Sequence, residues 1–185
     1  ISIGLDHILF IVSLLLPSVL VLRGREWFPA DNFRESLWFV VKVITLFTVA
    51  HSITLSLSAL EIVRLPVRLV EVIIAVSIAI VALNNLTGFL NRHIWLIVFG
   101  FGLFHGLGFA NVLAPLGVVK ESLLTSLVGF NIGVEIGQLV IISVLFPLLY
   151  AIRNWKSYQY QVMGLGSVGM IIVSMFWIVE RTLLS

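Results

Sequence analysis

The chain has 185 residues, of which 60% are hydrophobic and 11% are charged, and its formal net charge is +2. This apolar content exceeds what one soluble core of that size can bury, so the composition indicates an integral membrane protein. The small, dispersed charge argues against a nucleic-acid partner. Because the chain has no cysteine, any metal ion would be bound by imidazole, carboxylate or amide groups.

Apolar runs of the length that crosses a bilayer follow one another along the whole chain. They lack the alternating pattern of a transmembrane barrel, so helices are expected. The sequence therefore predicts an all-α polytopic bundle, a single domain over residues 1–185 with about six spans. The expected spans are residues 4–22, 37–60, 69–90, 94–115, 123–151 and 162–184.

Polar side chains interrupt five of these apolar runs, in chain order: Asp6 and His7, His51 and Ser52, Glu71, His105, and finally Asn131, Glu135 and Gln138. The first, third and fifth spans start on the side of the membrane where the second and fourth end. His51 and His105 then each lie about nine residues, or roughly 14 Å, below that surface. We expect the whole group to share one half of the membrane, whereas His93 lies at a loop boundary on the other side.

Glycines suggest how two of the spans pack. Gly102 and Gly106 form one small-xxx-small pair in the fourth span, and Gly129, Gly133 and Gly137 form two overlapping pairs in the fifth. Such pairs allow helix backbones to approach closely, so we expect the fourth and fifth spans to pack against each other.

The basic residues of the loops give an expected orientation. One side holds Arg23, Arg25, Arg34, Arg92, Arg153 and Lys156, together with Trp27, Trp38, Trp95, Trp155, Tyr158 and Tyr160. The other side holds Arg64, Arg68, Lys120 and Arg181. By the positive-inside rule the richer side is cytoplasmic, and both termini are then extracytoplasmic.

Three imidazoles with carboxylates and no thiols form a ligand set typical of zinc, nickel, cobalt or iron. The candidate metal ligands are His7, His51, His105, Asp6 and Glu135. Ser52, Asn131, Gln138 and Glu71 are the candidate outer hydrogen-bond partners of these ligands. The alternative is that each polar group makes one interhelical hydrogen bond and serves packing alone.

The segments GLDHILF, FTVAHSITLSL, FGLFHGLGFA and FNIGVEIGQL carry a family resemblance. In this order they resemble the blocks of the HupE/UreJ family of small bacterial membrane proteins, and of its second subgroup in particular. Gly4, Asp6 and His7 match the Gly-x-Asp-His block of that family. The resemblance implies a nickel or cobalt permease of the bacterial inner membrane.

Three functions are therefore open. The first is a nickel- or cobalt-type transporter, with a divalent ion as its cargo. The second is an intramembrane zinc hydrolase acting on a lipid amide or ester, with Asp6 or Glu135 as the general base. The third is a scaffold or sensor without catalysis. Membrane lipid is an expected partner, and an extracytoplasmic domain, a metal-delivery partner and a homo-oligomer are compatible with the pattern.

Overall fold

The computed structural model describes residues 4–24, 26–90, 93–113 and 123–183. Helices dominate the described chain, which confirms the all-α prediction. They are α1 (Leu5–Ser18), α2 (Phe33–Ala59), α3 (Val67–Thr87), α4 (Ile94–Leu113), α5 (Leu123–Ile152) and α6 (Leu165–Leu183). A π-helical segment, η4 (Tyr158–Gly164), leads directly into α6, and strands β1 (Leu20–Arg23) and β2 (Glu26–Pro29) form a hairpin.

Four helical segments are long and apolar enough to cross a membrane, namely Phe33–Ala59, Val67–Thr87, Thr125–Ile152 and Tyr158–Leu183. Two shorter apolar helices accompany them, Leu5–Ser18 and Ile94–Gly108. The expected first span continues to residue 22, but α1 ends at Ser18, one residue after Pro17. These helices identify the protein as an integral membrane protein.

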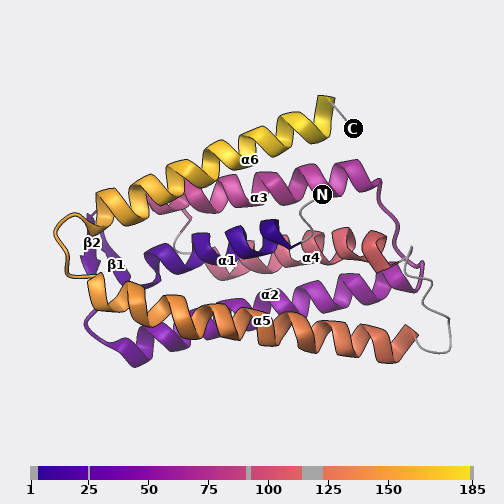
Figure 1. Cartoon of the computed structure of the whole chain (residues 1–185), viewed down its shortest axis with the longest axis horizontal. Coiled ribbons are helices and arrows are strands. Elements are labelled where there is room, and N and C mark those ends of the chain that lie inside the picture. The colour runs from indigo at the N-terminus through magenta and orange to yellow at the C-terminus, as the bar shows by residue number, and fades with distance from the viewer. Residues whose placement is uncertain (1–3, 25, 91–92, 114–122, 184–185) are drawn as a thin grey trace.

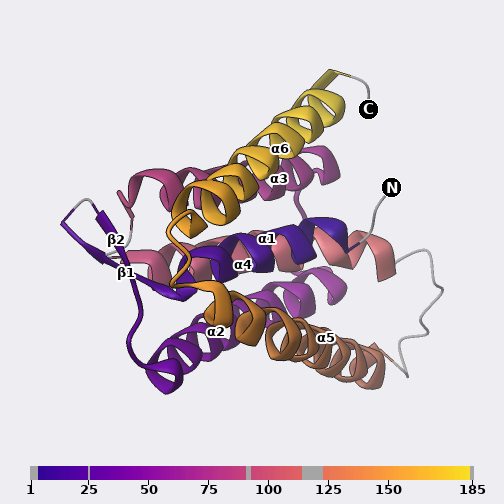
Figure 2. The same cartoon turned by 60° about the vertical axis from the view of Figure 1, so that its left-hand side comes forward.

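The helices lie in three layers of two, as Figure 2 shows: α3 with α6, α1 with α4, and α2 with α5. In Figure 1 the hairpin lies at one end of the bundle, whereas α1 begins and α6 ends at the opposite end. We call these the hairpin end and the terminal end. The main buried core joins α1, α2 and α3 through residues such as Phe10, Phe47 and Ile78.

Local sequence fixes two helix ends near the hairpin. The Asn32 side chain accepts hydrogen bonds from the backbone N–H groups of Arg34 and Glu35, and its Nδ2 donates to Glu35 Oε1 at 3.0 Å. This reciprocal cap starts α2. Gly88 ends α3 with a φ of 70°, in the left-handed region that glycine adopts without strain.

Two features of the hairpin end differ from expectation. The first span was expected to reach residue 22, but Leu20–Arg23 pairs with Glu26–Pro29 as an antiparallel hairpin, with Leu20 opposite Pro29. Tyr158 was expected among the loop aromatics of the more basic side, yet this residue is 1% exposed and its hydroxyl donates to the Leu16 carbonyl at 2.9 Å. A buried tyrosine needs such an acceptor, which the end of α1 provides.

The prediction that the fourth span packs on the fifth is wrong, because the glycines of α4 contact α2 and not α5. A Cβ added at Gly102 would lie 2.7 Å from the carbonyl oxygen of Phe47, and one at Gly106 would overlap the His51 carbonyl oxygen and Thr54 Oγ1. Both contacts are on α2, so α4 packs closely on α2. By contrast, a Cβ at Gly129, Gly133 or Gly137 of α5 would meet nothing described within 4 Å.

This contact predicts unequal effects of alanine at two glycines. Gly106→Ala forces the backbones of α2 and α4 apart, and overpacking of this kind costs about 1–3 kcal/mol of unfolding free energy. Gly133→Ala meets no described neighbour and is the matched control. Denaturant unfolding in mixed micelles measures both variants; equal losses of stability would contradict the packing.

Candidate functional site

The three histidines of the apolar spans meet at the terminal end of the bundle. His7 comes from the first turn of α1, His51 from the second half of α2 and His105 from α4. The ring centroid of His7 lies 5.4 Å from that of His51 and 4.8 Å from that of His105. We call this group the histidine cluster.

The cluster is dry. His51 and His105 are 0% exposed. The ring of Phe47 lies 5.1 Å from that of His105, and the ring of Phe10, which stacks on Phe47, lies 4.9 Å from the same imidazole. Polar atoms in such a setting depend on partners within the protein or on a bound ligand, because neither water nor lipid can supply them.

One hydrogen bond indicates the tautomer of His105. Ser77 Oγ donates to the backbone carbonyl of Ile74 at 2.7 Å and lies 3.0 Å from His105 Nε2. Since a serine hydroxyl has a single proton, which goes to Ile74, the Nε2 atom must carry the proton in its contact with Ser77. The lone pair of neutral His105 is then on Nδ1, which is buried and has no hydrogen-bond partner among the described residues.

Asp6 is held by a cation from the last helix. Nη2 of Arg181 lies 3.5 Å from Asp6 Oδ2, and His7 Nδ1 lies 3.6 Å from Asp6 Oδ1. Nη1 of Arg181 donates to the backbone carbonyl of Glu71 at 2.7 Å, and Arg68 Nε donates to the Arg181 carbonyl at 2.8 Å. The ends of α1, α3 and α6 are thus tied together beside the cluster.

The polar residues of α5 meet α2 instead of the histidines. Ser52 Oγ donates to Asn131 Oδ1 at 2.9 Å, and Thr48 Oγ1 donates to Gln138 Oε1 at 2.7 Å. Glu135 is exposed on the surface of α5. Asn131 and Gln138 therefore fasten one helix to another, as the packing interpretation of these residues predicts.

The side chains as they stand do not form a ready metal site. Across residues 4–24, 26–90, 93–113 and 123–183, no group of three or more His, Asp or Glu side chains is arranged to hold a metal ion. The His7 ring stands edge-on to both other imidazoles, at interplanar angles of 87° and 88°.

Sequence reasoning missed two polar residues of this region. Arg181 was counted only as a loop charge, although the end of α6 carries it back to the first turn of α1. Ser77 was not singled out, although Ser77 and Asn84 are seven residues apart in α3 and are both buried. That helical spacing is the available signal for Ser77.

Comparison with known proteins adds one finding. A family model described as HupE / UreJ protein matches residues 1–181, which is nearly the whole chain. No curated protein matches. No solved structure matches either.

The Ser77 contact predicts a stability effect. Ser77→Ala leaves His105 Nε2–H without its acceptor in a dry site, and an unsatisfied buried group costs about 1–3 kcal/mol. Ser143→Ala is the control, because this exposed serine bonds only its own helix backbone at Val140. Unfolding in mixed micelles should separate the two variants, and a Ser77→Ala protein as stable as the control would refute the assignment.

Proposed function

Because the chain belongs to the HupE/UreJ family, we propose that it transports a divalent cation of the nickel or cobalt type through the histidine cluster. The family is associated with nickel and cobalt transport in general. The observation that carries the assignment to this site is the meeting of three imidazoles from three helices at the terminal end.

The chemistry of the cluster suits such a cargo. Imidazole nitrogen binds nickel, cobalt and zinc, whereas magnesium and calcium prefer oxygen. In our proposal His105 offers Nδ1, His51 and His7 turn their rings to complete an imidazole set, and Asp6 provides the carboxylate beside them. Glu135 is exposed on α5, which makes Asp6 the better-placed acid.

His7 is suited to receive the ion first. Its side chain is 13% exposed and Asp6 is 16% exposed, whereas His51 and His105 are fully enclosed. An ion arriving at the terminal end would meet Asp6 and His7 and then pass to the two buried rings. We propose that the terminal end is extracytoplasmic and that the protein resides in a bacterial inner membrane, so that the direction is inward.

Transport predicts a specific pattern among the histidine variants. His51→Ala and His105→Ala should each lower the uptake of radiolabelled nickel into proteoliposomes by at least about ten-fold, since even outer partners of metal ligands contribute 10–100-fold. His93→Ala, at an exposed position ahead of α4, should leave uptake unchanged.

Bound nickel is measured on the same preparations by metal analysis. If both His51→Ala and His105→Ala took up nickel as fast as the wild type, the proposal would be overturned. Uptake equal to that of empty vesicles, combined with bound zinc that is lost in His105→Ala, would move the assignment to the intramembrane hydrolase. A wild type that neither transports nor binds metal would support the scaffold or sensor.

A further inference from the structure

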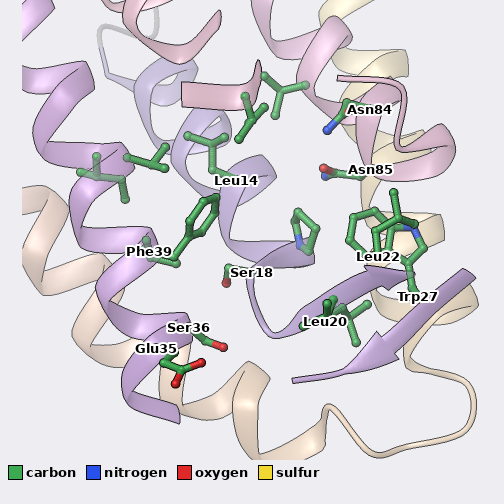
Figure 3. Close-up of a pocket in the computed structure, with 17 residues that line it drawn as sticks. Leu14, Ser18, Leu20, Leu22, Trp27, Glu35, Ser36, Phe39, Asn84 and Asn85 are labelled. Carbon is green, nitrogen blue, oxygen red and sulfur yellow. The ribbon is translucent and has the colours of Figure 1, made fainter. Parts of the chain in front are cut away.

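A cavity lies away from the histidine cluster, toward the hairpin end. It has a volume of about 400 Å³, within the range typical of small-molecule sites. Pro17 lines it, ten residues along α1 from His7, which corresponds to about 15 Å. The end of α1, the hairpin, the start of α2 and the end of α3 enclose it (Figure 3). We call it the hairpin pocket.

The wall of the hairpin pocket is mainly apolar. Leu14 of α1, Val43 and Ile44 of α2, and Val81 of α3 line its inner part. Phe39 and Val21, which also line it, are 50% and 42% exposed on the outside of the bundle. Because α2 is a membrane-spanning helix, a pocket bordered by such side chains is within reach of lipid tails.

One buried polar atom in this wall lacks a partner. Asn85 is 1% exposed, and its Nδ2 donates to the Ser13 carbonyl at 2.8 Å and to Ser167 Oγ at 3.2 Å. Its Oδ1 accepts no hydrogen bond from any described residue. Figure 3 shows the amide turned toward the pocket. A buried acceptor of this kind is costly unless a ligand supplies a donor.

The charge of the wall also favours a particular ligand. Among the described residues that line the pocket, Glu35 alone carries a charge. Its Oε1 accepts from Asn32, and the carboxylate lies in the first turn of α2, near the hairpin. A ligand with a cationic donor group complements this wall better than an anionic one.

We propose that the hairpin pocket binds a phospholipid with an ethanolamine headgroup. One acyl chain would lie against Leu14, Val43 and Val81, and the primary ammonium, which has three N–H donors, would find acceptors in the Glu35 carboxylate and Asn85 Oδ1. A phosphoglycerol lipid has the same tails but a net negative charge, which Glu35 repels. This inference is independent of the transported cargo.

The test is lipid retention by purified protein from bilayers of equal phosphatidylethanolamine and phosphatidylglycerol, measured by native mass spectrometry. Wild type should retain at least several-fold more ethanolamine lipid. Glu35→Gln keeps the N-terminal cap, because glutamine also serves at that position, and should lose the headgroup preference while still binding lipid. Val43→Phe fills the pocket and should lose the bound lipid altogether.

Val140→Phe is the matched control, since this residue is 57% exposed on α5 and does not line the pocket. It should retain lipid as wild type does. Equal retention of both lipids by wild type, or full retention in folded Val43→Phe, would overturn the proposal. If Val43→Phe does not fold, the comparison of wild type with Glu35→Gln decides, because unchanged preference in that variant also contradicts it. Nickel uptake is scored separately, so failure here leaves the transport proposal unaffected.

Discussion

The fold depends on one constraint: an imidazole inside a membrane span must find its partners within the protein, because hydrocarbon supplies none. His105 finds such a partner in Ser77 of α3, and the close contact of α2 with α4 helps to enclose both His51 and His105. Gly102 and Gly106 make that contact, since a side chain at either position would collide with the backbone of α2. Gly106, which helps to set the spacing of the two helices, lies against the backbone carbonyl of His51, one of the residues of the histidine cluster.

Buried polar groups find their partners in different ways at the two ends of the bundle. At the terminal end, ionic and imidazole groups gather from α1, α2, α4 and α6, with Arg181 beside the Asp6 carboxylate. At the hairpin end, neutral amides and hydroxyls bond one another: Asn85, which lines the hairpin pocket, donates to Ser167 Oγ. The polar groups of the first end are ionic or ionisable, whereas those of the Asn85–Ser167 pair are neutral.

Much of this arrangement was predictable because depth in a membrane follows from helix length. Counting residues from the loops predicted that His7, His51 and His105 share one half of the membrane, and the structure places the His7 ring within contact distance of the other two rings. Rotation about each helix axis was not predictable in the same way. From the sequence alone, the glycines of α5 could pack on any neighbouring helix, and Glu135 could face the cluster or the surface. The structure leaves Glu135 exposed, because α5 packs on α2 through residues such as Gln138. The hairpin and the return of Arg181 to Asp6 are contacts between distant segments, which local patterns do not encode.

The Arg181 contact also explains how the Asp6 carboxylate can lie in the bundle. A carboxylate that is 16% exposed at the start of a membrane helix needs a positive neighbour, and Arg181 provides one while its other nitrogen bonds the Glu71 carbonyl. Because Arg68 donates to the Arg181 carbonyl, the start of α3 is joined to the same point. The contacts of Arg181 therefore link the start of α1, the start of α3 and the end of α6.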